Sequence, residues 1–212
     1  MASKTKTIGG TDPTQPAGAV EERQGLPRSP REEDLRDRAY EIHLRRGAQP
    51  GYEVDDWLQA ERELTLEANK SIALRLVELF NDRRLDLLED VLHPEFRGRG
   101  ISAFPPDSPG VGPGARRKLY EMFYQAIPDA RAEVLDVVAE GDKVVVVDRF
   151  GGTHRGEFFG HPGTGNRIEW TAIHIYTIRD GKILEDAVMT DSLAIMQQLG
   201  LAPIAMQQTQ KY

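Results

Sequence analysis

Residues 167–190 read RIEWTAIHIYTIRDGKILEDAVMT, and this stretch decides the fold. Apolar and polar residues alternate on both sides of Asp180-Gly181, a dipeptide typical of a tight β-turn. The stretch therefore predicts a β-hairpin. His174 lies in the middle of the first strand, and three acidic residues follow on the returning segment. Such a hairpin can direct titratable side chains into a cavity.

The partner of His174 depends on the turn. If Asp180-Gly181 forms a two-residue loop, His174 faces Ala187 and shares one side of the sheet with Asp191. If the loop has three residues and Gly181 is a bulge, His174 lies directly opposite Asp186. Both arrangements remain open. The two-residue turn would gather on one face Trp170, Ala172, His174, Tyr176, Glu185, Met189 and Asp191.

The segments before this hairpin fall into two groups. Strand patterns with a period of two occur at 134–139, 144–150 and 153–159. Helical patterns precede them, among them residues 115–127, where Phe123 lies on the apolar side and Tyr120 and Tyr124 lie one turn apart beside it. Helices first and an antiparallel sheet second predict an α+β fold with the helices packed on one face.

The chain begins with features of a different kind. Residues 1–28 hold prolines, glycines and polar residues without an apolar face, so we expect a disordered tail. Residues 29–68 predict a helical hairpin that starts at Ser29-Pro30. A helix cap at Asn69 or Ser71 would then open the main domain, residues 69–202, and 203–212 would form a C-terminal tail. Within the main domain, we expect residues 97–114 to form one short strand and a long mobile loop.

Composition limits the possible functions. The chain has 212 residues, a net charge of −7 and no cysteine. Nucleic acid is therefore not an expected partner, and disulfides and thiolate metal sites are excluded. No apolar run approaches the length of a membrane span or a signal peptide, so we expect a cytoplasmic protein with no membrane partner.

Neither a metal nor a cofactor is expected. His154, Glu157 and His161 have spacings of three and four, which suit one face of a helix, but their segment predicts strand and loop. No glycine-rich loop is followed by the residues that hold a phosphate.

Four blocks of the chain resemble SnoaL-like polyketide (ester) cyclases, which have a nuclear-transport-factor-2-like fold. They are AEGDKVVVV at 139–147, GTHRGEFFGHPGTG at 152–165, IHIYTIRDGKILED at 173–186 and DSLAIMQQLG at 191–200. Residues 31–66 resemble a short helical domain of unknown function found in bacterial proteins.

This resemblance implies a cone, in which a strongly curved sheet wraps round helices and leaves an apolar pocket at its open end. It also implies acid-base chemistry by an aspartate and a histidine without cofactor or metal. The catalytic candidates are His174, Asp186 and Asp191. We expect the pocket to be lined by Trp170, Tyr176, Tyr120, Tyr124, Phe123 and Met189.

Three functions are consistent with these observations. The first is a cofactor-independent cyclase or isomerase acting on a small, largely apolar carbonyl compound. The second is a non-catalytic protein that binds a small molecule in the same pocket. The third is an interaction module that forms a homodimer through the sheet. Arg97 and Arg99, where relatives often carry a histidine, could favour a carboxylate or phosphate on the ligand.

Overall fold

The structure, a computed structural model, describes residues 30–100, 110–158 and 160–202. The strands are β1 (Leu92–Gly100), β2 (Arg131–Glu140), β3 (Lys143–Thr153), β4 (Arg167–Arg179) and β5 (Lys182–Thr190). The helices are α1 (Glu32–Arg45), α2 (Glu53–Asn81), the 3-10 turn η1 (Leu85–Leu87), α3 (Leu88–Val91), α4 (Pro113–Ala126) and α5 (Ser192–Gln198). Both predicted tails, and most of the loop predicted within 97–114, lie outside the described residues.

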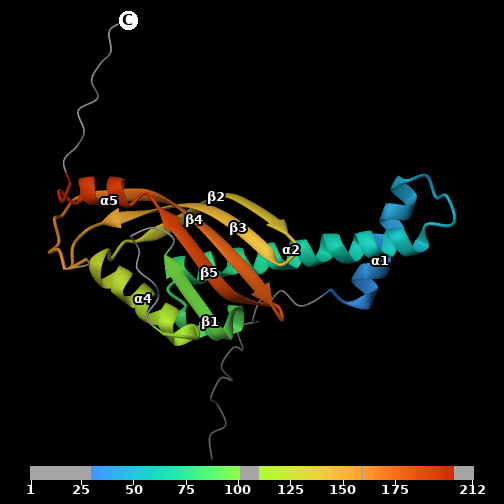
Figure 1. Cartoon of the computed structure of the whole chain (residues 1–212), viewed down its shortest axis with the longest axis horizontal. Coiled ribbons are helices and arrows are strands. Elements are labelled where there is room, and N and C mark those ends of the chain that lie inside the picture. Colours follow the sequence, from blue (N-terminus) through green and yellow to red (C-terminus); the bar gives the residue numbers. More distant parts are fainter. Residues whose placement is uncertain (1–29, 101–109, 159, 203–212) are drawn as a thin grey trace, which may run out of the picture.

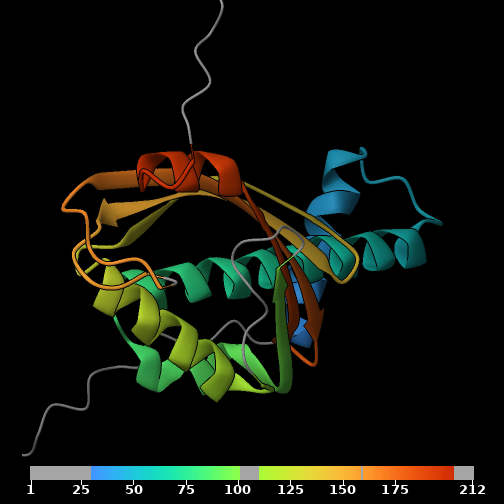
Figure 2. The same cartoon turned by 60° about the vertical axis from the view of Figure 1, so that its left-hand side comes forward.

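The strands form one curved sheet in the order β1-β5-β4-β3-β2. Figures 1 and 2 show the sheet arching over α2 and α4, which lie on its inner side. The predicted α+β class and curved sheet are confirmed. One detail was wrong: β1 pairs with β5 in parallel, so the sheet is mixed and not wholly antiparallel.

The core lies between the inner face of the sheet and the two helices. Alternate residues of β3 and β4 are buried, as expected for strands with one face packed and one exposed. Leu76 and Phe80 of α2 and Phe123 of α4 meet this face. The pattern fixes which side chains reach the interior of the cone.

Helix α2 is longer than the sequence predicts. We expected a new helix after a cap at Asn69 or Ser71, but a single helix of 29 residues runs through both positions. Asn69 donates from its side-chain amide to the carbonyl of Gly141 (3.1 Å), and the Ser71 hydroxyl donates to the carbonyl of Glu67 (3.0 Å). These polar side chains therefore serve the packing of α2 on the sheet and its own backbone, and neither caps a helix.

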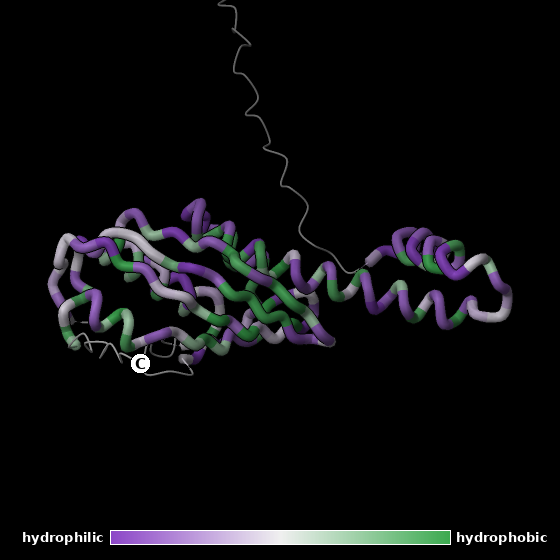
Figure 3. Tube along the Cα trace, turned by 90° about the horizontal axis from the view of Figure 1, so that it is seen from above, coloured by the Kyte–Doolittle hydropathy of each residue, from purple (hydrophilic) through white to green (hydrophobic). Residues whose placement is uncertain are grey.

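Helix α1 folds back on α2 and forms the predicted hairpin, which projects beyond the sheet (Figures 1 and 3). It begins at Glu32, later than Ser29-Pro30 suggests, and Asp34 accepts a hydrogen bond from the backbone of Arg31 (3.2 Å). In Figure 3 the hairpin is mostly hydrophilic, whereas hydrophobic residues are concentrated in the strands. No described helix has the length and apolarity needed to cross a membrane.

The predicted strand at 153–159 is not present as such. Strand β3 extends to Thr153, and beyond it only an isolated bridge joins Phe158 to His161. His154 receives a hydrogen bond from the backbone of Thr164 (3.3 Å) and holds this segment as a loop. The alternation in the sequence therefore marks side chains packed from a loop and not from a strand.

The β4–β5 hairpin turns in two residues. Asp180 and Gly181 both have positive φ, 52° and 68°, which is the conformation of a type I′ turn. Ile178 faces Ile183, but the pairing then slips by one residue, so that His174 faces Val188. A bulge at Leu184 thus moves every later residue of β5 to the opposite face.

Candidate active site

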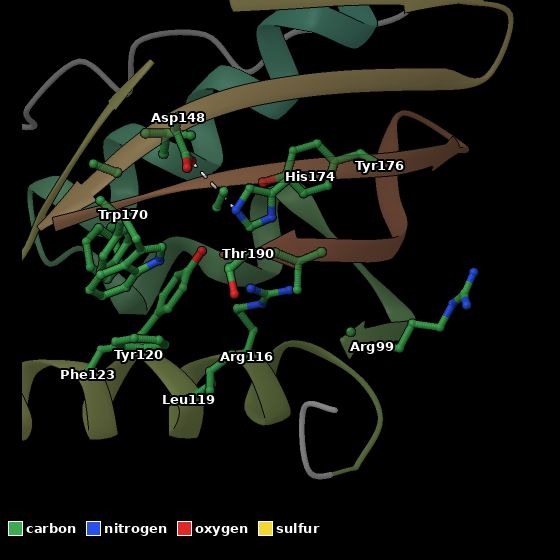
Figure 4. A pocket seen from close by; sticks show the side chains of 17 residues that line it. Arg99, Arg116, Leu119, Tyr120, Phe123, Asp148, Trp170, His174, Tyr176 and Thr190 are labelled. Atoms are coloured by element: carbon green, nitrogen blue, oxygen red, sulfur yellow. Dashed lines mark ion pairs between the residues drawn. The ribbon is translucent and has the colours of Figure 1, made fainter. Parts of the chain in front are cut away.

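A narrow cavity of about 60 Å³ lies between the inner face of the sheet and α4 (Figure 4). Its wall is mainly apolar and aromatic, and each ring contacts at least one other in the set Phe80, Tyr120, Phe123, Phe150 and Trp170. Typical small-molecule pockets measure roughly 300–1,000 Å³. The cavity therefore suits a small ligand, and a larger one would require these rings to move.

Four charged side chains form a line beside the cavity, and three of them, Arg116, His174 and Asp148, line it. Arg116 of α4 donates to Asp186 Oδ2 (2.5 Å), and both side chains are almost fully buried. Asp186 contacts His174 Nδ1 through both oxygens (3.0 and 3.1 Å). His174 Nε2 lies 3.6 Å from Asp148 Oδ2. The order is Arg116, Asp186, His174, Asp148, with positive and negative groups alternating when the histidine is protonated.

Strand register brings three of these residues together. Asp148 pairs with Ala172, and Asp186 pairs with Tyr176, so each acid is a diagonal neighbour of His174 on the same face. The Tyr176 ring stacks on the His174 ring at 5.5 Å between centroids and 11° between planes. The imidazole is thereby held with Nδ1 toward Asp186 and Nε2 toward Asp148.

The surroundings of Asp186 and Asp148 shift the pKa values of their carboxyl groups in opposite directions. Burial alone would raise the pKa of Asp186, but the charges of His174 and Arg116 outweigh it and lower that pKa to about 2. Burial raises the pKa of Asp148 to about 6, against the opposing effect of His174. Asp186 is thus a fixed anion, whereas Asp148 changes its protonation state near neutral pH.

His174 favours its charged form. Burial would lower the pKa of the imidazole, but Asp186 and Asp148 together raise it above its usual value. Because Asp186 accepts at Nδ1, that nitrogen carries a proton. The line therefore places an imidazole that favours its protonated form between two carboxyl groups.

The structure brings some of the expected site residues together and separates others. His174 and Asp186 form a pair, and Trp170, Tyr176, Tyr120 and Phe123 line the cavity. The pair arises in neither of the two ways considered, since the turn has two residues and His174 still reaches Asp186 diagonally.

Three expected site residues lie elsewhere. Met189 is 46% exposed on the outer face, because the bulge at Leu184 reverses its side of the strand. Asp191 is exposed and caps α5, where its side chain accepts from the backbone of Ala194 (2.9 Å). The Tyr124 hydroxyl donates to the carbonyl of Phe80 (2.7 Å), and Tyr124 does not line the cavity.

Two residues of the charged line were missed by the sequence reasoning. Asp148 follows Val144 and Val146 at a spacing of two, so a carboxylate on the buried face of a strand could have been recognised. Arg116 lies one turn before Leu119 and Tyr120 on the inner side of α4, which places a cation on an otherwise apolar stripe. A charged residue in register with buried positions was the available signal.

The family of the chain can be stated from comparison with known proteins. The model of the SnoaL-like polyketide cyclase family matches residues 70–199, which is more than half of the chain. The chain belongs to the SnoaL-like polyketide cyclase family. A second family model, a protein of unknown function (DUF2934), matches residues 30–65. No curated protein matches.

Solved structures of SnoaL-like proteins share the fold. A protein from Jannaschia sp. CCS1, assigned as a SnoaL-like polyketide cyclase, is 26% identical; the match covers 65% of this chain and 95% of that one, with a TM-score of 0.58. IdmH from Streptomyces antibioticus, assigned as a polyketide cyclase, is 28% identical over 62% and 98% of the two chains, with a TM-score of 0.53.

A third similar structure has a different assignment. AclR from Streptomyces galilaeus, assigned as a hydroxylase, is 26% identical over 66% and 89% of the two chains, with a TM-score of 0.57. Structural neighbours of this chain thus carry more than one assigned activity, and the chemistry must be argued from the site itself.

Arginine side chains lie near the opening of the cavity. Arg99 lies at the cavity mouth, where its Nε donates to Glu185 (2.7 Å), and Arg97 is exposed. Within the described ranges, no group of three or more His, Cys, Asp or Glu side chains is arranged to hold a metal ion.

Proposed function

We propose that this protein catalyses proton transfer at a carbon next to a carbonyl group, without a cofactor, on a small, largely apolar substrate. Asp148 is the base and His174 the acid. The observation that carries the proposal is the contact of His174 Nε2 with Asp148 Oδ2 (3.6 Å) at the wall of an apolar cavity. Membership of the SnoaL-like family supports the same class of reaction.

Asp148 is suited to accept a proton, and His174 is suited to donate one. Asp148 Oδ1 is buried and has no hydrogen-bond partner within the described part of the chain, so a lone pair is available for a substrate proton. A base works best when its pKa lies near the working pH, and the Asp148 pKa of about 6 meets this condition. His174, held protonated by Asp186, can supply a proton to a carbonyl oxygen.

In an intramolecular aldol cyclisation, Asp148 and His174 return to their starting protonation states after each turnover. Asp148 removes the α-proton, and the C–H electron pair becomes an enolate. The enolate carbon attacks a second carbonyl carbon, and His174 gives its Nε2 proton to the oxygen that becomes the alcohol. Asp148 then returns its proton to His174 across the 3.6 Å contact. No proton is gained or lost overall: the α-C–H bond and one C=O π bond are broken, and a C–C bond and an O–H bond are formed.

Exchange of α-protons tests this proposal without knowledge of the natural substrate. We expect the protein to accelerate deuterium incorporation into 2-indanone in D2O, followed by NMR. The rate should rise as pH increases through about 6, because Asp148 must be ionised to act as the base. Binding of 2-indanone with no faster exchange than in buffer would favour a non-catalytic binding protein.

We also propose that the protein forms a homodimer through the outer face of the sheet. Val138, Val145 and Ile175 are neighbours across β2, β3 and β4, and Ile173 lies beside Met189 on β5. Val138 is 55% exposed and Met189 46%. A continuous apolar surface of this kind typically marks a protein interface, and a second copy presents the same surface.

Charge placed on this face should separate the two copies. Ile175→Glu is expected to weaken dimerisation at least about 10-fold, since an unpaired carboxylate would be buried at the centre of the interface. Thr171→Glu, at an exposed position of the same strand, is the matched control. Sedimentation velocity over a concentration series measures both variants. A wild-type protein that stays monomeric at about 100 μM would contradict the dimer.

A further inference from the structure

Tyr120 lies on the wall of the cavity that faces the acid-base pair. It comes from α4, whereas Asp148 and His174 come from the sheet, and all three line the same cavity. Figure 4 shows the Tyr120 side chain reaching from α4 towards the strands. A ligand held between α4 and the sheet would therefore have Tyr120 on one side and Asp148 and His174 on the other.

The position of the Tyr120 ring is fixed by its neighbours. Phe80 packs edge-on against it, with 4.8 Å between ring centroids and 70° between planes. The Arg116 guanidinium carbon lies 5.4 Å from the ring centroid. Tyr120 is only 8% exposed, and these contacts hold its ring at the wall of the cavity. A hydroxyl group held in this way is positioned before any ligand enters.

The Tyr120 hydroxyl is protonated and is available as a donor. Burial raises the pKa of Tyr120 to about 12, and Asp186 and Asp148 add to this, although the charge of Arg116 opposes them. The Arg116 side chain donates a hydrogen bond to the hydroxyl oxygen, so the O–H proton remains for another acceptor. Tyr124, one turn later on α4, already donates to Phe80. The hydroxyl groups of the two tyrosines on this helix therefore have different surroundings.

We propose that Tyr120 is a catalytic residue that donates a hydrogen bond to the carbonyl oxygen of an enolisable ketone whose α-carbon faces Asp148. This inference rests on the proposed function and deepens it. As Asp148 takes the α-proton, the electron pair moves to the carbonyl oxygen, and the Tyr120 O–H stabilises the negative charge there without transferring its proton. His174 then remains free to protonate the second carbonyl group.

The arrangement also indicates the class of substrate. The carbonyl oxygen must lie at the α4 side and the α-carbon at the Asp148 side, with an apolar ring or chain against Phe123 and Trp170. Small cyclic ketones and 1,3-diketones meet these requirements. Loss of one preorganised donor to an oxyanion lowers turnover by about 10²- to 10³-fold.

Two matched variants test the inference. Tyr120→Phe removes only the hydroxyl of the cavity tyrosine, and Tyr124→Phe removes that of its neighbour. We expect Tyr120→Phe to exchange the α-protons of 2-indanone about 100-fold more slowly than wild type, while Tyr124→Phe stays within about 3-fold. Thermal melting of each variant checks that it remains folded.

A binding measurement separates this inference from the proposed function. 4-Nitrophenol, whose ionised form absorbs visible light, resembles an enolate in charge and requires no proton abstraction from carbon. Tyr120→Phe should weaken binding of the ionised form at least about 10-fold relative to wild type and to Tyr124→Phe. Equal binding and equal exchange in wild type and Tyr120→Phe would overturn the role of Tyr120 and leave the Asp148–His174 proposal standing. Loss of nitrophenolate binding in Tyr120→Phe, with no exchange even in wild type, would support the donor and overturn the proposed reaction.

Discussion

Replacement of Asp148 by asparagine is expected to lower the rate of α-proton exchange by about 10²- to 10⁴-fold, the usual contribution of a positioned base. Asparagine keeps the size and shape of the side chain but cannot accept a proton at neutral pH. The unpartnered Oδ1 of Asp148 is the atom on which the prediction depends. Exchange into 2-indanone, measured between pH 5 and 9, should also lose its rise near pH 6.

The same substitution should not weaken the fold above pH 6. The pKa of Asp148 is raised from 3.8 in the unfolded chain to about 6 in the folded protein. The neutral carboxyl therefore favours the folded state at low pH, and this contribution is lost as pH rises through about 6, at a cost of roughly 2–3 kcal/mol. The amide of the Asp148→Asn variant is neutral at every pH in this range. At pH 8 this variant should unfold at the same or a higher urea concentration than wild type.

A matched control and an alternative base complete this test. Asp142→Asn changes an exposed aspartate in the β2–β3 turn and should alter neither exchange nor stability. His174→Gln should also slow exchange, because the acid is lost. If Asp148→Asn keeps more than about a tenth of the wild-type rate while His174→Gln is inactive, then His174 is the base and the assignment of Asp148 is wrong.

The fold could be predicted from the sequence where local chemistry determines it. Asp180-Gly181 forms the tight turn that the dipeptide indicates, with two residues, one of the two loop lengths considered; both positions require positive φ, and these residue types accept it at low cost. The final helix begins at Ser192 after an aspartate cap and is followed by Gly200 with φ of 76°. Signals of this kind depend only on neighbouring residues.

The register of β5 could not be predicted in this way. The bulge at Leu184 lies where β5 also pairs with β1, and the β1–β5 pairing is irregular at the same place, between Leu92 and Arg97. β1 is about ninety residues earlier in the chain, so the sequence of the hairpin alone does not indicate that β1 pairs with β5. The slip removed Met189 from the cavity and placed Asp186 on the inner face beside His174.

Only two of the four charged residues of the candidate site could be predicted from the sequence, for a related reason. His174 and Asp186 attract notice because they lie in one hairpin, whereas Asp148 and Arg116 join them from β3 and α4. Their partners are 26 and 70 residues away in the chain. A buried charge in a strand or helix has chemical meaning only once its partner is known, and the partner is set by tertiary structure.

The largest effect on stability is expected from Asp186→Asn. Asp186 is fully buried and contacts both Arg116 and His174. Removal of its charge leaves the Arg116 guanidinium, 4% exposed, without its anion in the interior. Breaking one side of a buried ion pair typically costs about 3–5 kcal/mol, because the remaining charge cannot recover its hydration. We expect a loss of about this size in the free energy of unfolding, measured with urea at pH 7.

The adjacent residue provides a control that differs chiefly in burial. Glu185 pairs with Arg99 at 2.7 Å, but both side chains are more than one third exposed, so Glu185→Gln should cost about 0–1 kcal/mol. The pH dependence gives an independent check. The pKa of Asp186 is lowered from 3.8 to about 2, so its stabilisation is present above about pH 4 and is lost as pH falls through about 2. Equal losses in the two variants would show that burial does not govern these pairs. Arg116 and Asp186 would then not be the fixed ionic support on which the position and charge of His174 depend.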